Sequence, residues 1–408
     1  MLQGFVHPNF SEVANVLRGQ LPKSGIGGAA VSVFHQGECV VDIWGGTRSQ
    51  DKKPWEKDTL SLSFSTTKGI ASTLLHVLAE KNLIDYDIPI VHYWPEFGQC
   101  GKTHITVREA LTHEAGLYSI RSMVEHADEM TDWEAMVRYI EQAEPCHIPG
   151  TANGYHGLTY GFVIGEVIRR VTGTSFSEAL QEHIAKPLNL HGLYCGLPED
   201  QMDRRAKLIL PERANHSGKR RSRWRKTMVK TAINGALWFT GGDIEHTRQG
   251  LLPKGISNFD FNSPEVVQSC IPSANGMFTA RSLAKVYSMI ANGGELDGVR
   301  LLSENRVARM GQVQNKRRDK VVHLPMKWRL GYHRVFTTGP KTPNAFGHFG
   351  FGGSGAWCDP SRGLSVAMTL NSGVGTPFGD SRIAYINSAA LKAADKIGRR
   401  RPSLASAY

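Results

Sequence analysis

The spacing of apolar residues changes character along the chain. Residues 28–44 alternate between apolar and polar positions, are rich in valine and contain Gln36-Gly37, which predicts a β-hairpin with a tight turn. Residues 10–21 have helical spacing. Residues 59–64 indicate a short strand, and a helix follows from about Ser65. The first part of the chain therefore combines strands with flanking helices.

Helical signals dominate from about 106 to 200. A Thr or Ser followed three residues later by Glu forms a capping box, which predicts helix starts at Thr106, Thr131 and Ser175. Gly173 predicts the end of a helix. Residues 201–275 are irregular, basic and rich in glycine, so we expect a long loop or lid there. Further along the chain, a Thr is expected to cap a helix over 283–291.

The last part of the chain returns to strands at 331–336, 355–359 and 364–371, before a final helix over about 381–397. Strands at both ends and helices between them predict an α+β fold, with an antiparallel sheet built from the N- and C-terminal segments. We expect an α/β lobe of residues 1–75 and 320–408. A mostly helical lobe of residues 76–319 would be inserted into it, with the active site in the cleft between the lobes.

Composition narrows the class of protein. The 408 residues are 40% hydrophobic and 21% charged, as in a globular protein, and contain no run of 18 apolar residues, which excludes a membrane span. The N-terminus has no basic flank and no apolar stretch, so it does not resemble a secretory signal. The six cysteines are too far apart in sequence for a metal pair, and we expect free thiols and a cytoplasmic protein.

Positive charge is concentrated in one segment. The net charge is +11, and residues 204–230 hold eleven Lys or Arg against one acid, Glu212. Such a run either binds nucleic acid or another anionic surface, or is a solvent-exposed insertion without a partner. We favour the insertion and expect no nucleic-acid partner, because no nucleic-acid-binding signature accompanies the run.

The first candidate for chemistry is the pair Ser65 and Lys68. Residues three apart on a helix share a face, so the lysine amine can reach and activate the serine hydroxyl. Two other Ser-x-x-Lys pairs occur, at 49–52 and 282–285. Only Ser65 lies where a strand passes into a helix and a glycine, Gly69, follows the lysine. From the sequence alone, Ser65 is either a nucleophile or an ordinary helix cap.

Two further segments are candidates for the same site. Tyr155 lies in the turn-rich stretch 149–161, where it either faces a cleft or packs in the core. Glycine is dense over 347–355, which marks a close approach of a ligand or a turn between strands. No Gly-Lys-Ser/Thr follows, which disfavours a phosphate loop. The sequence also lacks Gly-x-Ser-x-Gly and His-Glu-x-x-His, which excludes a standard α/β-hydrolase elbow and a common zinc hydrolase.

These segments occur in a recognisable order. Ser65-Thr66-Thr67-Lys68-Gly69 is followed by Leu111-Thr112-His113-Glu114-Ala115-Gly116-Leu117, then by Tyr155 and His348-Phe349-Gly350. In this order the chain resembles the serine β-lactamase-related hydrolases over nearly its whole length. Within that superfamily it looks most like the family VIII carboxylesterases, which are relatives of class C β-lactamases and penicillin-binding proteins. The resemblance implies a β-lactamase/transpeptidase-like fold.

The resemblance also implies roles for individual residues. Ser65 would be the acylated nucleophile, Lys68 its partner and Tyr155 the general base. His348, at the start of His348-Phe349-Gly350, would stand where the relatives have the lysine of Lys-Thr-Gly, with Gly350 at its glycine. The backbone amides of Ser65 and Phe351 would form the oxyanion hole.

Two positions depart from the lactamase pattern. Gly157 replaces the asparagine of Tyr-x-Asn, and a histidine, which is mostly neutral at pH 7, replaces the strand lysine. Both changes weaken the case for lactam or peptidoglycan substrates. We therefore expect a carboxylesterase that cleaves small, short-chain esters without a metal or organic cofactor. Five aromatic residues are candidates for lining its pocket: Trp44, Phe64, Tyr118, Phe349 and Phe351.

Two alternatives remain open. One is an enzyme of the same mechanism that acts on β-lactams or D-amino peptides. The other is a non-catalytic scaffold with a penicillin-binding-like fold, against which the intact Ser65, Lys68 and Tyr155 argue.

Overall fold

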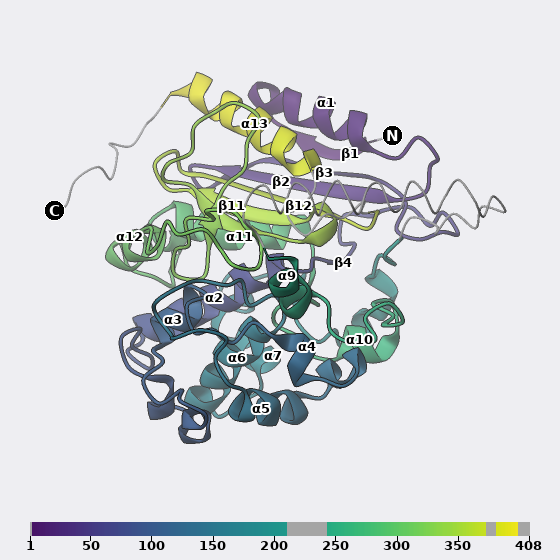
Figure 1. Cartoon of the computed structure of the whole chain (residues 1–408). Coiled ribbons are helices and arrows are strands. Elements are labelled where there is room, and N and C mark those ends of the chain that lie inside the picture. Colours follow the sequence, from purple (N-terminus) through teal and green to yellow (C-terminus); the bar gives the residue numbers. More distant parts are fainter. Residues whose placement is uncertain (1, 210–242, 373–380, 399–408) are drawn as a thin grey trace.

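The computed structural model of the chain describes residues 2–209, 243–372 and 381–398. At its centre is a seven-stranded sheet in the order β1-β3-β2-β12-β11-β10-β9 (Figure 1). Each neighbouring pair is antiparallel. The strands are β1 (Leu2–Val6), β2 (Gly28–His35), β3 (Glu38–Gly46), β9 (His333–Arg334), β10 (Phe346–Phe349), β11 (Gly355–Asp359) and β12 (Leu364–Leu370).

The sheet joins the two ends of the chain. β2 and β12 lie side by side, in a register that places Ala29 opposite Leu370 and His35 opposite Leu364. All positions of both strands are buried, as expected for central strands covered on both faces. The predicted α+β fold with an antiparallel sheet from both terminal segments is confirmed. The predicted hairpin turn at Gln36-Gly37 is also present, between β2 and β3.

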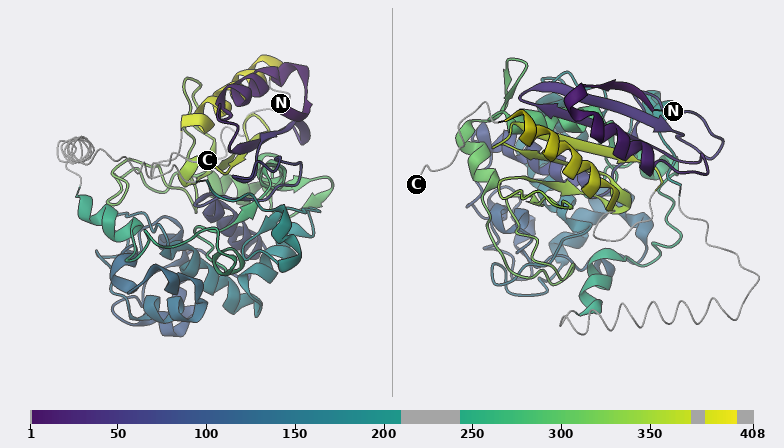
Figure 2. Two further views of the ribbon diagram at one scale, coloured as in Figure 1. Left: turned by 90° about the vertical axis from the view of Figure 1, so that its right-hand side faces the viewer. Right: turned by 90° about the horizontal axis from the view of Figure 1, so that it is seen from above.

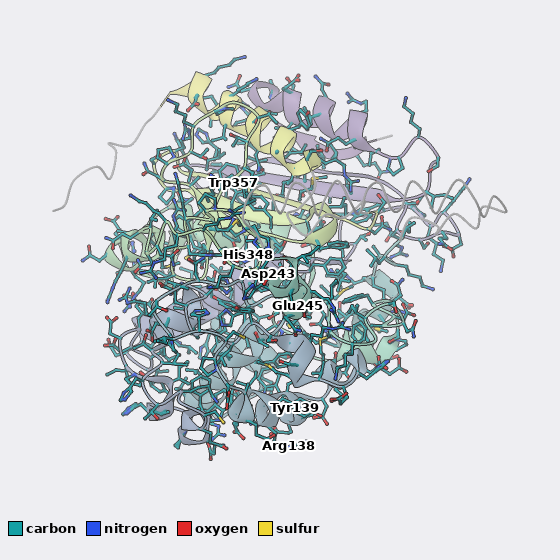
Figure 3. The ribbon with its side chains drawn as sticks, viewed as in Figure 1. Arg138, Tyr139, Asp243, Glu245, His348 and Trp357 are labelled. Carbon is teal, nitrogen blue, oxygen red and sulfur yellow. The ribbon has the colours of Figure 1, made fainter. Side chains whose placement is uncertain are left out.

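Helices cover both faces of the sheet. α1 (Ser11–Gln20) and α13 (Ser381–Ile397) lie side by side on one face, as the view from above shows (Figure 2). α11 (Ala280–Ala291) and α2 (Thr66–Glu80) cover the other face. In Figure 3, Trp357 lies toward the α13 side of the sheet, whereas His348 of the neighbouring strand lies nearer the helices below. The second face is therefore where sheet and helical layer meet.

The remaining elements form the helical layer and its connections. The α-helices are α3 (Val107–Leu111), α4 (Ile120–Met123), α5 (Trp133–Gln142), α6 (Thr159–Thr172), α7 (Phe176–Leu180), α9 (Ile244–Leu251), α10 (Pro264–Gln268) and α12 (Glu304–Gly311). The 3₁₀ helices are η1 (Pro8–Phe10), η2 (Ile90–His92), η3 (Pro95–Gly98), η4 (Ala127–Thr131), η6 (Glu199–Arg204) and η7 (Phe351–Gly353), and η5 (Gln181–Ala185) is a short π-helix. The short strands are β4 (Ser61–Leu62), β5 (Leu193–Tyr194), β6 (Met277–Phe278), β7 (Glu295–Leu296) and β8 (Val299–Arg300).

Two of the three predicted capping boxes are confirmed. Thr106 and Ser175 each accept from the amide three residues on, and Glu109 and Glu178 close the boxes. The box at Thr131 is wrong, because α5 begins one residue later.

Residues 201–275 are not one long loop, since they include η6, α9 and α10. Most of the basic segment, from residue 210 onward, lies outside the described residues. No helix in the described ranges is both long and apolar enough to cross a membrane.

Candidate active site

Ser65 lies at the turn that leads from β4 into α2. The preceding residue, Phe64, has a φ of +42°, a left-handed conformation that bulky residues rarely adopt. This turn makes Ser65 the N-cap of α2, although its side chain does not cap the helix. The hydroxyl is therefore available to groups outside the helix.

Lys68 lies one turn further along α2 and is completely buried. Its Nζ is 2.9 Å from Ser65 Oγ, 2.7 Å from the carbonyl oxygen of Gly157 and 2.9 Å from that of Ser273. Burial lowers the pKa of Lys68 well below its usual range. The two carbonyls can accept the two N–H bonds of a neutral amine, which leaves its lone pair facing the serine hydroxyl.

Tyr155 approaches the same serine from the loop before α6. Its hydroxyl donates to Ser65 Oγ at 2.7 Å. Its ring stacks on Trp328, with the planes 8° apart and the centroids 5.6 Å apart. Burial raises the pKa of the Tyr155 phenol, and the negative charge of Asp319 raises it further. The phenol is therefore a hydrogen-bond donor at neutral pH.

Asp319 fixes the position of Tyr155 from behind. Its buried carboxylate accepts five hydrogen bonds, among them those from the Tyr155 amide at 3.0 Å and the Trp328 indole at 3.1 Å. The other three donors are Asn153 Nδ2 and the amides of Val321 and Val322. Burial raises the pKa of Asp319, and these donors counteract it by stabilising the ionised form. Asp319 thus holds the stacked Tyr155 and Trp328 as one unit.

A pair of neutral histidines supports the other side of Tyr155. His156 Nε2 accepts a hydrogen bond from the Leu117 amide, so the proton of the neutral ring is on its Nδ1. This Nδ1 lies 3.3 Å from His113 Nδ1. The His113 ring is 5.0 Å from Tyr155 and 4.2 Å from Trp328. Burial lowers the pKa of His156 to about 3 and that of His113 well below its usual range. Neither histidine adds charge to the site.

The turn between β10 and β11 packs directly against the start of α2. Ser354 Oγ donates to the Ser63 carbonyl at 2.7 Å, and a Cβ on Gly350 would lie 2.3 Å from that same oxygen. The Phe351 ring lies 5.4 Å from that of Phe64. The backbone amides of Ser65 and Phe351 donate no hydrogen bond to any described residue. Within the described part of the chain, both amides therefore remain available to donate a hydrogen bond to a bound group.

Gly157, which replaces the expected asparagine, lies against α9. A Cβ there would come within 2.5 Å of Leu251 Cδ2 and 2.6 Å of the Gly250 carbonyl. The space that a side chain would need is thus already filled. The carbonyl of Gly157 instead serves as an acceptor for Lys68.

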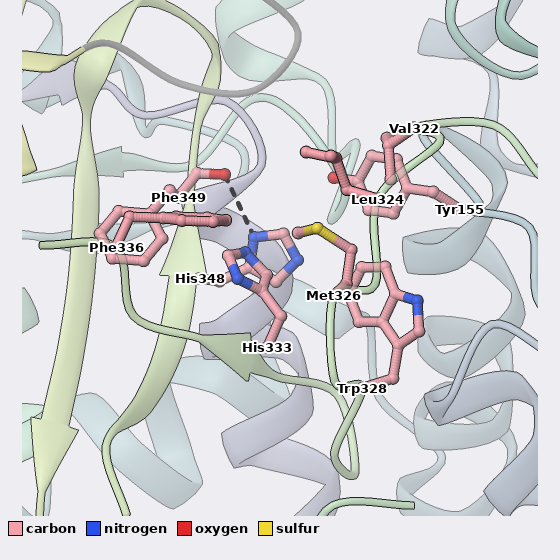
Figure 4. A pocket seen from close by; sticks show the side chains of 9 residues that line it. All are labelled: Tyr155, Val322, Leu324, Met326, Trp328, His333, Phe336, His348 and Phe349. Atoms are coloured by element: carbon pink, nitrogen blue, oxygen red, sulfur yellow. Dashed lines mark hydrogen bonds between the residues drawn. The ribbon is translucent and has the colours of Figure 1, made fainter. Parts of the chain in front are cut away.

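A narrow pocket opens beside Tyr155, with about 30 Å³ of space for the centres of water-sized groups (Figure 4). Its lining consists of Tyr155, Val322, Leu324, Met326, Trp328, His333, Phe336, His348 and Phe349. Of the five aromatics proposed from the sequence, Phe349 lines this pocket and the other four do not. His348 lies within it, with its ring 4.7 Å from that of His333 and 6.2 Å from that of Tyr155.

The structure separates the three Ser-x-x-Lys pairs. Ser282 bonds to the helix cap Thr279, and Lys285 forms an ion pair with Asp297. Ser49 bonds to Asp51. Only the pair at Ser65 meets a buried tyrosine.

Sequence reasoning missed Asp319, Trp328 and His333. Asp319 lies within Arg317-Arg318-Asp319-Lys320, a charged run that usually indicates a solvated surface. Only the fold brings it beneath Tyr155, so no local signal reveals its role.

Comparisons with known proteins address the family of the chain. The sequence profile of the β-lactamase family matches residues 13–391. The chain is 35% identical over 373 residues to the esterase/β-lactamase LipL of Mycobacterium tuberculosis. The aligned region covers 90% of this chain and 82% of LipL.

Solved structures give the same result. A family VIII carboxylesterase superposes with a TM-score of 0.83 at 32% identity, covering 96% of this chain and all of that chain. A penicillin-binding protein homologue from Caulobacter crescentus superposes with a TM-score of 0.82, also at 32% identity, with the same coverage. The β-lactamase/transpeptidase-like fold is thus confirmed.

Fold and relatives together define a hydrolase of the esterase and β-lactamase superfamily. Within it, the chain belongs to the β-lactamase family, and it is similar to family VIII carboxylesterases, as its sequence motifs predict.

Proposed function

We propose that the protein is a carboxylesterase that cleaves short-chain esters through an acyl-enzyme on Ser65. One observation carries the proposal: Ser65 Oγ lies within hydrogen-bonding distance of both Lys68 Nζ and the Tyr155 hydroxyl. A serine between a depressed-pKa amine and a phenol has the nucleophile and the proton carriers that acyl transfer needs.

In the proposed reaction, neutral Lys68 takes the proton of Ser65 as its oxygen attacks the ester carbonyl. Tyr155, which its raised pKa keeps protonated, gives its phenol proton to the leaving alcohol, and the Lys68 ammonium then returns the proton taken from Ser65 to the phenolate. The amides of Ser65 and Phe351, which donate to no described residue, stabilise the oxyanion. Water then attacks the acyl-enzyme by the reverse proton path, and no metal or organic cofactor takes part.

The neutral environment of the pocket favours an ester over an anionic lactam. Burial lowers the pKa of His348 well below its usual range, so no cation stands there to bind a substrate carboxylate. The name of LipL includes both activities, so the direct comparison is the rate on p-nitrophenyl acetate against a chromogenic cephalosporin. We expect efficient turnover of the ester and poor turnover of the cephalosporin.

The acyl-enzyme is tested by labelling. A fluorophosphonate probe should label the protein once, and Ser65→Ala should abolish both labelling and ester hydrolysis. Ser282→Ala, at the second Ser-x-x-Lys pair, is the matched control and should retain both. Labelling that persists in Ser65→Ala would contradict the proposal.

A further inference from the structure

The two histidines of the pocket are held in the same tautomer. His348 Nδ1 lies 3.3 Å from the Phe349 carbonyl oxygen, and His333 Nδ1 lies 2.9 Å from that of Arg334. A carbonyl oxygen only accepts hydrogen bonds, so each Nδ1 carries the proton and each Nε2 carries a lone pair. Both rings are therefore hydrogen-bond acceptors at Nε2.

No described residue donates a hydrogen bond to either Nε2, and of the two atoms only that of His348 is buried from solvent. His348 is only 2% exposed, so its unpaired nitrogen is a buried polar atom. Such an atom costs free energy unless a ligand or water satisfies it. Figure 4 shows the His348 ring bonded to Phe349 on one side and facing Met326 on the other. The pocket thus offers unused acceptors within an apolar lining.

Charge does not compensate for the missing partners. Burial lowers the pKa of His333 to about 4 and that of His348 well below its usual range. Both rings are neutral at physiological pH, and their lone pairs would repel a carboxylate. A neutral group with an O–H bond complements them instead.

Tyr155 indicates which part of an ester reaches this pocket. Its ring lines the pocket, and its hydroxyl lies 2.7 Å from Ser65 Oγ. In the proposed mechanism Tyr155 passes a proton to the leaving alcohol, so that alcohol must lie beside it.

We propose that the pocket binds the alcohol part of esters whose alcohol carries a second hydroxyl group. Monoesters of diols and other small polyols are the substrate class. His348 Nε2 accepts the hydrogen bond of the free hydroxyl, and His333 Nε2 offers a second acceptor beside it. This inference rests on the proposed esterase function, and it adds the identity of the leaving alcohol.

Three butyrate esters of similar size test the inference. 2-Hydroxyethyl butyrate carries the second hydroxyl, propyl butyrate replaces it with a methyl group, and 2-methoxyethyl butyrate keeps the oxygen but lacks the O–H. Release of butyric acid is followed by titration at constant pH. We expect kcat/KM for the hydroxyethyl ester to exceed that for each of the other two by about tenfold or more, because a buried acceptor left unpaired, His348 Nε2, penalises the analogues.

Variants of the protein assign the effect to the pocket. His348→Phe should bring the ratio of hydroxyethyl to propyl ester close to one, and His333→Phe should lower it. His35→Phe is the matched control, because His35 is a buried histidine that packs against Phe10 away from the pocket. It should keep the parent ratio.

The outcomes separate the two proposals. Equal kcat/KM values for the three esters in the parent protein would overturn the inference while leaving the esterase proposal intact. A preference that survives in both pocket variants would also overturn it. A parent protein that hydrolyses none of the three and is not labelled at Ser65 would contradict the esterase function itself. The comparison in the parent protein decides the matter even if a variant fails to fold.

Discussion

Lys68 brings three oxygen atoms around one buried amine. Because burial lowers its pKa, Lys68 is neutral over a range in which an exposed lysine is charged. As the pH falls through this lowered pKa, the amine gains a proton and can no longer accept one from Ser65. We therefore expect kcat/KM for p-nitrophenyl acetate to rise with pH. The midpoint of this rise, the acidic limb of the pH profile, should lie below the usual lysine pKa of about 10.4.

The variant Tyr155→Phe tests whether Lys68 or Tyr155 produces this rise in activity with pH. The variant should lower kcat by about two orders of magnitude, the usual scale for a proton-transferring side chain. The midpoint of the rise in activity with pH should stay where it is in the parent protein, because the pKa of Lys68 sets it. If the limb disappears with the phenol, Tyr155 is the base and the assignment of Lys68 is wrong.

Asp319 provides the second prediction at this scale. Asp319→Asn keeps the shape of the side chain but replaces one acceptor oxygen with a donor. The three amides that donate to Oδ1, or Asn153 and Trp328, which donate to Oδ2, then lose their acceptor. We expect Tyr155 and Trp328 to shift, and kcat for p-nitrophenyl acetate to fall by about 10- to 100-fold, because small displacements of catalytic groups are costly.

Comparing the change in kcat with the change in KM distinguishes a loss of Tyr155 positioning from a general disruption of the fold. KM should change by less than about threefold in Asp319→Asn, since the histidines and phenylalanines that line the rest of the pocket make no hydrogen bond to Asp319. Asp203→Asn, at an exposed carboxylate, is the control and should retain parent values. A variant with unchanged kcat would show that Asp319 does not position Tyr155.

The element scale shows what the sequence could and could not predict. The hairpin, α2, α11 and α13 follow from periodicity and helix caps, because their signals are local. β1 was not predicted, since its middle three residues are exposed and its apolar positions do not alternate. The cap at Thr131 failed because Asp132 is an equally suitable cap and accepts from the Ala135 amide, while Thr131 bonds to Asp128 instead.

The same limits apply to the candidate site. Ser65, Lys68 and Tyr155 could be brought together through their motifs and the order in which these occur. The pocket could not, because its lining comes from the loop at Tyr155, residues 322–336 and β10, which only the tertiary fold brings together. Aromatic residues such as Tyr118 gave no signal that separates pocket lining from core packing.

The contact between α9 and Gly157 leads to a prediction about an element. Gly157→Asn restores the motif of the lactamase relatives but places a side chain against Leu251 and Gly250. Overpacking of this kind costs about 1–3 kcal/mol of unfolding free energy. We expect that loss in chemical denaturation, together with lower esterase activity, because the Gly157 carbonyl is displaced from Lys68.

Gly19→Asn in α1 is the matched control, because a Cβ at Gly19 meets no atom within 4 Å. It should change the unfolding free energy by less than about 0.5 kcal/mol, as surface substitutions usually do. If Gly157→Asn is as stable as the parent, α9 moves away readily and does not restrict this position.

At the scale of the whole molecule, α13 ties the C-terminal segment to the sheet. Asn387 accepts from the Trp357 indole at 2.7 Å and donates to the Phe336 carbonyl at 2.9 Å. Asn387→Ala leaves both groups without this partner, which costs about 1–3 kcal/mol for each one left unsatisfied. We expect the denaturation midpoint to fall by the same amount whether followed by tryptophan fluorescence or by circular dichroism, since one sheet joins both ends of the chain.

Asn15→Ala on the exposed side of α1 is the control for this change and should leave the midpoint nearly unchanged. Two transitions that separate in Asn387→Ala would show that the C-terminal helix unfolds on its own.

The pairing of β2 with β12 also has a consequence for synthesis on the ribosome. β2 emerges early, yet the strand that covers its open edge lies at 364–370, near the other end of the chain. At roughly 5–20 residues per second, this edge waits for tens of seconds with its backbone unpaired and its apolar side chains uncovered. The nascent chain is therefore most prone to aggregation before its last strands are made, and a chaperone that shields strand edges should raise the yield of folded protein.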